Sequence, residues 1–247
     1  MLNHKRIIVI TGASRGIGLG IAQAFIKEDA LVFSMDKDKY EGDLPIYQFI
    51  GDVADRYDRE MFVNFVLSYV NHVDVFIHNA MESSHGILSP LDLDQFEHIL
   101  SIGITAPYHL IALFKNHMPF GSNMINIVST RAFQSQKNTE AYSSAKGGLT
   151  SLTHALANSL SPTIRVNAIA PGWIDTHDSD LSNEDQTQHL THSVGDVNDI
   201  AEMALFLASS KAKFITAQTF VVDGGMSKRM IYHNDEGWTY QIGRAHV

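Results

Sequence analysis

The chain has 247 residues, enough for one large α/β domain, and 45% of them are hydrophobic, an ordinary share for a packed core. Its formal charge of −9 argues against a surface that binds nucleic acid or an anionic membrane. It contains no cysteine, which excludes disulfides, thiolate metal sites and cysteine nucleophiles.

Short β-branched runs alternate with longer stretches of helical periodicity. Several of the short runs are apolar without strict alternation, which is typical of strands covered on both faces. Strands that alternate with helices imply right-handed crossovers, so the sequence predicts an α/β fold with a doubly wound parallel sheet. The expected strands are Arg6–Thr11, Leu31–Met35, Tyr47–Gly51, Val73–His78, Asn123–Ser129, Arg165–Ala170 and Thr219–Val222. The expected helices are Gly16–Lys27, Arg56–Val70, Thr105–Lys115, Tyr142–Leu160 and Val197–Ala208.

The rest of the chain gives weaker patterns. A polar stretch between Trp173 and Val194 predicts a mobile flap with one short helix. No low-complexity linker interrupts the pattern, so we expect a single domain over residues 1–240, with 241–247 a non-native or disordered tail. The sequence has no apolar stretch of about eighteen residues and no secretion signal, which predicts a cytoplasmic protein without a membrane span.

A glycine-rich turn lies between the first strand and the first helix, where the sequence reads Thr11-Gly12-Ala13-Ser14-Arg15-Gly16-Ile17-Gly18. Glycines let the backbone approach a pyrophosphate, and the helix N-terminus offers it free N–H groups. The turn therefore predicts a dinucleotide site, although a tight turn without a ligand is the alternative. The candidate cofactor-binding residues here are Gly12, Ser14, Arg15, Gly16, Ile17 and Gly18.

Acidic residues follow the next two strands. Asp36 ends the second strand, where a carboxylate can accept hydrogen bonds from the adenosine ribose and repel a 2′-phosphate. Asp36 therefore predicts NAD in preference to NADP, while Arg15 and Lys37 could meet a 2′-phosphate and favour NADP. Asp52 follows the third strand and is placed to contact the adenine edge.

The candidate catalytic residues are Ser129, Tyr142 and Lys146. Tyr142 and Lys146 are four residues apart and share one helix face, so an ammonium could lower the pKa of the phenol and make it a general acid/base. Ser129 ends a strand at the edge where α/β sheets bind ligands, and its hydroxyl could polarise a carbonyl. A surface Tyr/Lys pair and a turn serine are the alternatives.

Together these motifs resemble the short-chain dehydrogenase/reductase family over Ile7 to about Met226. The resemblance implies a Rossmann-type sheet of seven strands and hydride transfer between a nicotinamide cofactor and an alcohol or ketone, with Tyr142 as general acid/base, Lys146 on the ribose and Ser129 on the substrate oxygen. It also implies a homo-oligomer, a tetramer or dimer, formed through the helices near 105–115 and 142–160. The further cofactor-binding residues that it implies are Val53, Asn79, Ala80, Pro171, Gly172, Ile174 and Thr176.

One departure from the family pattern bears on activity. The family's catalytic asparagine, which helps to hold a water in the proton relay, is replaced by Gly103. This predicts a slow enzyme or a catalytically weak cofactor-binding protein, and it predicts that Gly103→Asn raises turnover and thermal stability. Alternatively, His78 or Ser101 supplies the missing hydrogen bond.

Two features of the sequence bear on other kinds of site. Gly12-Ala13-Ser14-Arg15-Gly16 formally fits a hydrolase nucleophile elbow at Ser14, but it follows the first strand and no oxyanion motif accompanies it. The chain has thirteen histidines but no His-Glu-x-x-His motif, so we expect no metal site and interpret His189 and His192 as part of a solvated flap.

Overall fold

The computed structural model describes residues 5–90 and 92–239, and its centre is a parallel sheet of seven strands in the order β3-β2-β1-β4-β5-β6-β9. The chain starts in the middle of the sheet, builds one edge, then returns and builds the other. The strands are β1 (Ile7–Thr11), β2 (Leu31–Asp36), β3 (Ile46–Ile50), β4 (Val75–His78), β5 (Ser122–Ile127), β6 (Ile164–Pro171) and β9 (Thr219–Val222). The predicted doubly wound fold is confirmed.

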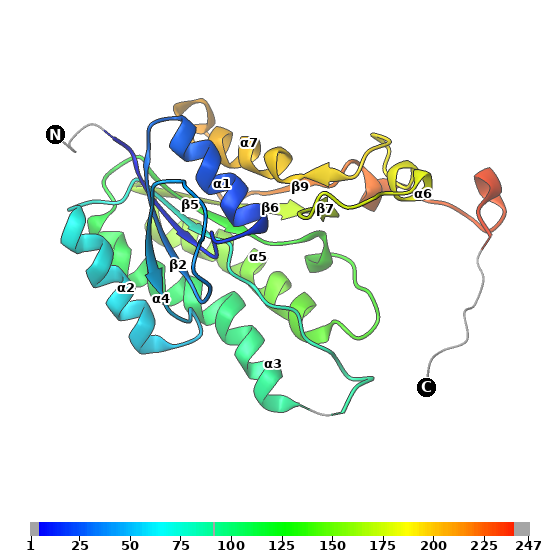
Figure 1. Cartoon of the computed structure of the whole chain (residues 1–247), viewed down its shortest axis with the longest axis horizontal. Helices are drawn as coiled ribbons and strands as arrows, with labels where there is room; N and C mark the ends of the chain where they lie inside the picture. Colours follow the sequence, from blue (N-terminus) through cyan, green and yellow to red (C-terminus); the bar gives the residue numbers. More distant parts are fainter. Residues whose placement is uncertain (1–4, 91, 240–247) are drawn as a thin grey trace.

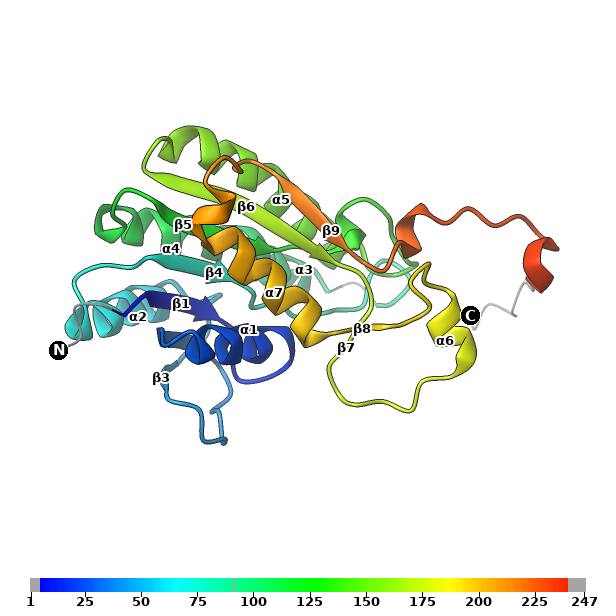
Figure 2. The same ribbon diagram turned by 90° about the horizontal axis from the view of Figure 1, so that it is seen from above.

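Helices cover both faces of the sheet (Figures 1 and 2). One face is covered by α1 (Gly16–Lys27) and α7 (Val197–Ala208). The other face is covered by α2 (Arg56–Tyr69), α4 (Ala106–Phe114) and α5 (Glu140–Leu160). The helix α3 (Leu93–Leu100) packs beside α5 and leads through a π-helical turn, η1 (Ser101–Thr105), directly into α4.

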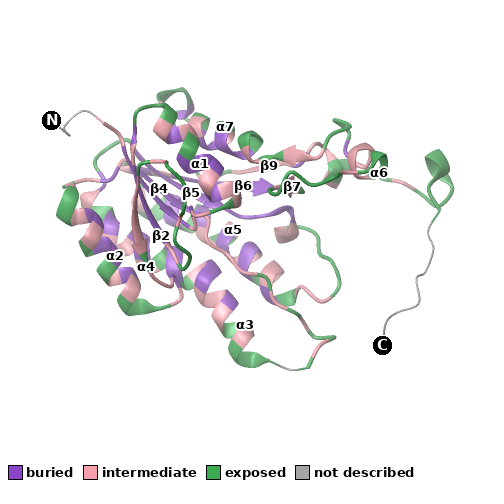
Figure 3. Cartoon of the chain, in the orientation of Figure 1, coloured by how far each residue is buried: buried purple, intermediate pink, exposed green. Residues whose placement is uncertain are grey.

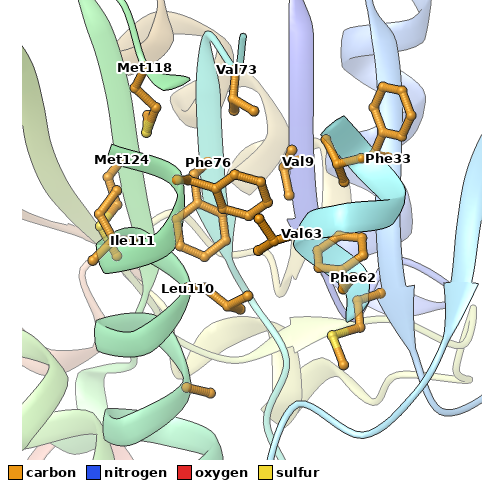
Figure 4. Close-up of a cluster of buried hydrophobic side chains, with 14 of the residues drawn as sticks. Val9, Phe33, Phe62, Val63, Val73, Phe76, Leu110, Ile111, Met118 and Met124 are labelled. Carbon is orange, nitrogen blue, oxygen red and sulfur yellow. The ribbon is translucent and has the colours of Figure 1, made fainter. Parts of the chain in front are cut away.

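Buried side chains form two main hydrophobic clusters, one on each face of the sheet. In Figure 3 the buried residues lie along the strands and on parts of the helices that cover them. Successive strand residues point to opposite faces, so Val9 lies in the cluster under α2 and α4 while Ile8 and Ile10 lie under α1 and α7. Figure 4 shows the first cluster, in which Phe76 of β4 lies between Ile111 and Val63. Packing on both faces explains why these strands are almost continuously apolar.

The carboxyl ends of the strands lie at one edge of the sheet, and the strand order reverses between β1 and β4. Thr11 and His78, the last residues of these two strands, are register partners. Ligands of doubly wound folds bind at such a switch point. The topology therefore directs attention to the loops that follow β1, β4 and β5.

Some boundaries differ from those predicted. Helix α3 was not predicted, and α5 begins at Glu140, two residues before the predicted start. The flap contains the predicted short helix, α6 (Asn183–Thr187). Its two ends are joined by a small two-stranded sheet of β7 (Ile174–Asp175) and β8 (Gly195–Asp196), the latter directly after the flap. The predicted tail at 241–247 lies outside the described residues.

Short 3-10 turns complete the fold. They are η2 (Lys115–His117), η3 (Thr130–Ala132), η4 (Ser210–Ala212), η5 (Met226–Lys228) and η6 (Asp235–Gly237). Within the described ranges, no helix is both long and apolar enough to cross a membrane, and no three metal-ligating side chains gather.

Candidate active site

A cleft of about 560 Å³ opens at the carboxyl edge of the sheet. Fifteen of the eighteen residues predicted for the site line it: Gly12, Arg15, Ile17, Asp36, Asp52, Val53, Asn79, Ala80, Ser129, Tyr142, Lys146, Pro171, Gly172, Ile174 and Thr176. Ser14, Gly16 and Gly18 do not line it. The sequence analysis did not include nine further lining residues in the predicted site: Met35, Lys37, Asp38, Gly51, Met81, Glu82, Ile102, Ile127 and Val128.

The glycine-rich turn forms the floor of the cleft because it packs too closely for side chains. Gly12 has a φ of +74°, and a Cβ on it would lie 2.9 Å from the Cα of Ala80. A Cβ on Gly18 would lie 2.0 Å from the Gly12 carbonyl oxygen and 2.5 Å from the Asn79 side-chain amide nitrogen, so Gly18 allows α1 to pack closely on the loops after β1 and β4. Arg15, the N-cap of α1, makes no side-chain cap hydrogen bond, so its side chain does not occupy the N–H groups of the first turn. This cradle fits a dinucleotide pyrophosphate.

Ser14 stabilises the loop instead of facing the cleft. Its Oγ donates a hydrogen bond to the Asp38 carbonyl at 2.7 Å and accepts one from Gln48 Nε2 at 2.8 Å. A hydrolytic nucleophile needs a base as its hydrogen-bond acceptor, and a backbone carbonyl cannot act as one. The geometry therefore removes the hydrolase alternative.

Four carboxylates and two cations line the end of the cleft near β2. The Asp36 carboxylate accepts the backbone N–H groups of Ser14 at 2.9 Å and Asp38 at 3.2 Å. Arg15 forms an ion pair with Asp38 at 2.7 Å. Lys37 Nζ lies 2.8 Å from Glu82 and 3.4 Å from Asp52, and the hydrogen bond that Lys37 donates to Glu82 raises the pKa of this lysine. Both cations thus have carboxylate partners.

Thr11 and His78 form a buried polar pair at the switch point. Thr11 Oγ1 lies 3.1 Å from His78 Nδ1 and also 3.1 Å from the backbone nitrogens of Asn79 and Ala80. Because the two N–H groups occupy both acceptor positions of the hydroxyl, its proton is donated to His78 Nδ1. Burial, together with the charge of Lys146, lowers the pKa of His78 to about 3, so the imidazole is neutral and carries its proton on Nε2. That Nε2 is buried, and the backbone of Ile102 interacts with the ring and acts to raise its pKa, against the larger effect of burial.

Ser129, Tyr142 and Lys146 meet at the middle of the cleft. Lys146 is 2% exposed, its Nζ donates to the Ile127 carbonyl at 2.7 Å, and burial lowers its pKa to about 7. Burial raises the pKa of the Tyr142 hydroxyl, while a hydrogen bond to Ser129 and the nearby Arg131 guanidinium act in the opposite direction. The net shift of the Tyr142 pKa is upward. The predicted lowering of this pKa by Lys146 is therefore wrong for the protein without a bound cofactor. A lysine with a pKa near 7 carries only part of a charge at neutral pH.

The π-helical turn η1 forms another wall. The Ala106 N–H donates to the Ser101 carbonyl, and Pro107, at the next position, has no N–H to donate. Neither Ala106 nor Pro107 therefore donates a helical hydrogen bond to the carbonyl of Ile102. Ile102 lines the cleft, and its backbone interacts with the His78 ring. Gly103 packs against α5, where a Cβ would lie 2.7 Å from the Cβ of Ala145.

One side chain of the largely exposed flap is buried, although the polar sequence predicted a solvated segment. His189 is 1% exposed, and its ring centroid lies 6.2 Å from that of Trp173. A Cβ on Gly224, in the turn after β9, would lie 3.2 Å from the Cβ of His189. The interpretation of His189 as a solvated residue is therefore wrong, whereas His192 is exposed as expected. Trp173 is half-exposed and contacts the flap.

A doubly wound sheet with a glycine-rich turn and a cleft at its switch point defines a Rossmann-type α/β protein. Residues 12–227 match the family model described as Enoyl-(Acyl carrier protein) reductase. An uncharacterized oxidoreductase of Thermotoga maritima is 38% identical, with 94% of this chain and 99% of that protein aligned. The 3-oxoacyl-(acyl-carrier-protein) reductase FabG of Chlamydia pneumoniae is 30% identical over 89% of this chain and 96% of that protein.

Solved structures agree with these relatives. An apo SCOR enzyme from Clostridium thermocellum superposes with a TM-score of 0.91 at 42% identity, covering 96% of this chain and 99% of that one. A blue fluorescent protein from a metagenomic library, solved with NADPH, gives a TM-score of 0.82 at 27% identity, covering 91% and 99%. The chain belongs to the short-chain dehydrogenase/reductase family, a family of oxidoreductases.

Proposed function

We propose that the protein transfers a hydride between a nicotinamide cofactor and an alcohol or ketone, with Tyr142 as general acid/base. One observation carries this proposal: a phenol, a serine hydroxyl and a buried lysine lie together at the carboxyl edge of the sheet, in the same cleft as the glycine-rich turn. Such a set provides proton transfer and orientation of an oxygen beside a dinucleotide site.

Each side chain has a defined task. When the cofactor is bound, its nicotinamide accepts or supplies the hydride. Tyr142 takes the hydroxyl proton of an alcohol as its C–H bond breaks, or gives that proton to a ketone oxygen in reduction. Ser129, which accepts the Arg131 backbone N–H at 3.2 Å, donates its own proton toward the substrate oxygen. Lys146 and Asn79 help to form the cofactor-facing wall.

Replacing Tyr142 by phenylalanine tests the mechanism. We expect turnover to fall by at least about a hundredfold, because general acid/base groups contribute about 10² to 10⁴ in rate. Cofactor affinity should change little, since the ring still packs. A screen of alcohols and ketones that follows absorbance of the reduced cofactor measures turnover, and fluorescence titration measures affinity. The matched control is Tyr57→Phe, a change on the exposed face of α2.

Two outcomes of that screen would contradict the proposal. Full turnover in the Tyr142→Phe variant would exclude the phenol as the acid/base. Cofactor binding with no turnover of any alcohol or ketone by the unmodified protein would favour the weak, cofactor-binding alternative suggested by Gly103.

NAD is the preferred cofactor in this proposal. Asp36 supplies a negative charge beside the expected ribose, and the two cations that could meet a 2′-phosphate already have carboxylate partners. We expect Asp36→Asn, which removes the charge but keeps one acceptor oxygen, to narrow the preference by about tenfold, equivalent to about 1.4 kcal/mol. Titration of both dinucleotides measures it. Tighter NADP binding by the unmodified protein would reverse the assignment.

Homo-oligomer formation through α4 and α5 is also part of the proposal. Tyr108 on α4 is 57% exposed, although the rest of that helix is largely apolar and buried. The mass in solution, measured by light scattering, should be two or four times that of one chain.

A further inference from the structure

Arg131 places a cation beside the phenol, and the proposed hydride transfer does not use it. It belongs to η3, directly after β5, and its Cζ lies 5.4 Å from the centroid of the Tyr142 ring. Its backbone N–H donates to Ser129 Oγ at 3.2 Å. The turn that fixes the serine therefore also positions a guanidinium against the tyrosine.

The charge of Arg131 has no carboxylate partner among the described residues, because no acidic oxygen there lies within 4.0 Å. Its side chain donates one hydrogen bond, to Gln136 Oε1, out of the five donors of a guanidinium. Other arginines of the described chain differ: Arg15 and Arg56 pair with acids, and Arg165 donates to backbone carbonyls. Glu140, close by on α5, instead accepts the Ile87 N–H at 3.0 Å.

The acids at the other end of the cleft do not compensate for this cation. Asp36 ends β2, and Arg131 follows β5; between those strands lie β1 and β4. Three inter-strand steps of about 4.8 Å separate the two positions by about 14 Å, which exceeds the Debye length in physiological salt. The carboxylate-rich end of the cleft is therefore remote from Arg131, which does not itself line the cleft but contacts two side chains that do, Ser129 and Tyr142.

We propose that Arg131 binds a carboxylate of the substrate, so that the enzyme prefers hydroxy acids and oxo acids to neutral alcohols and ketones. The inference rests on the proposed function. A guanidinium matches a carboxylate with two parallel N–H···O bonds, and one that is partly buried binds it more strongly than in open water. Since the guanidinium contacts the phenol ring, the carboxylate lies within a few bonds of the reacting carbon. That carbon's hydride passes to the nicotinamide, and its hydroxyl proton passes to Tyr142.

The test compares acids with their methyl esters, which differ in charge and little in shape. The probes are acetoacetate and levulinate with the methyl ester of each, and the readout is the acid-to-ester ratio of kcat/KM. We expect this ratio to exceed about ten in the unmodified protein and to fall at least about tenfold in Arg131→Gln, because a charged hydrogen bond is lost. Arg131→Lys should retain an intermediate ratio. The control Arg56→Gln, on the surface of α2, should leave the ratio unchanged.

A binding measurement separates this inference from the proposed function. Binding of each probe to the enzyme with NADH is followed by nucleotide fluorescence, and thermal melts confirm that each variant is folded. Acids that bind through Arg131 but are never turned over would support the inference and contradict the proposed function. The inference would be overturned, and the proposed function left standing, if the unmodified protein turned over esters and acids at the same rate and Arg131→Gln gave the same ratio. If Arg131→Gln does not fold, the acid-to-ester ratio of Arg131→Lys is used instead. An Arg131→Lys ratio equal to that of the unmodified protein would then overturn the inference.

Discussion

The burial of Lys146 lowers the free energy of unfolding, although the residue belongs to the candidate active site. It is buried on α5, and burial lowers its pKa from 10.5 to about 7. Between these two pH values the unfolded chain binds more protons than the folded one, so stability rises with pH across that window. Below pH 7 the Lys146 amine is protonated in both the folded and the unfolded state, so the full free-energy cost of burying its charge remains. At 1.36 kcal/mol per pKa unit, that cost is a few kcal/mol.

We therefore expect Lys146→Met to stabilise the protein at pH 7 while abolishing turnover. The variant should also lose the extra stability that the unmodified protein gains between pH 7 and pH 9. Urea unfolding at both pH values measures the two effects, and Lys211→Met, at an exposed position, is the control. A variant less stable than the unmodified protein at pH 7 would mean that the Nζ hydrogen bond to Ile127 outweighs desolvation.

Residues of the cleft differed in how far the sequence could predict them. Tyr142 and Lys146 are four apart on one helix, and Ser129 follows the end of β5 by two residues, so local patterns were sufficient to select these three side chains. The contact between Lys37 and Glu82 joins the ends of β2 and β4, which lie on either side of β1. No local pattern encodes such a contact, because it depends on strand order.

At the scale of elements, the turn from α3 into α4 corrects the prediction made for Gly103. A glycine in a helix costs up to about 1 kcal/mol relative to alanine, which suggested that a side chain at this position would help. The structure places the Cβ of Ala145 2.7 Å from any Cβ at position 103. The glycine therefore allows η1 and α5 to approach closely, and its replacement strains both.

We now expect Gly103→Asn to lower stability by about 1–3 kcal/mol, the usual cost of overpacking, and not to raise turnover. The control is Gly147→Ala on α5, where the nearest heavy atom to a new Cβ is the Ala132 carbonyl oxygen at 3.9 Å. That variant should be as stable as the unmodified protein or more so. Thermal melts compare the two, and the double variant Gly103→Asn with Ala145→Gly should recover most of the loss. An equal or higher melting temperature for Gly103→Asn alone would contradict the packing explanation.

The sequence of helix α3, which was not predicted, carries a helix-start signal other than periodicity. Asp92 is its N-cap and accepts the Gln95 N–H at 2.9 Å. An acidic cap followed three residues later by glutamine is a helix start that the sequence displays. The helix has only eight residues, which is too short for an apolar period to be recognised. Strands β7 and β8 have two residues each and gave no pattern for the same reason.

For the whole molecule, stability comes from the two hydrophobic clusters on either side of the sheet. Phe76 is fully buried at the centre of the cluster beneath α2 and α4 (Figure 4). The apolar strands predicted this double burial, and for that reason the overall fold was predictable where loops were not. His189 illustrates the difference, since a polar flap sequence does not reveal which of its side chains packs on a distant turn.

Phe76→Ala should destabilise the protein by about 3–5 kcal/mol through loss of burial and creation of a cavity. Phe120→Ala, at a position that is 79% exposed, should change stability by less than about 0.5 kcal/mol. Chemical unfolding of both variants measures the difference. Similar losses in the two variants would mean that Phe120 is covered in solution, as an interface between chains would require.

Pro107 affects the cleft without lining it. Because it lacks an N–H, the Ile102 carbonyl five residues earlier has no donor at that position, and this carbonyl belongs to a residue of the cleft wall next to His78. An imino acid in the first turn of α4 thus leaves the Ile102 backbone to interact with the ring of His78 instead of with the helix. In this protein, the surroundings of a buried histidine at the switch point are partly set by a residue whose own side chain is apolar and buried.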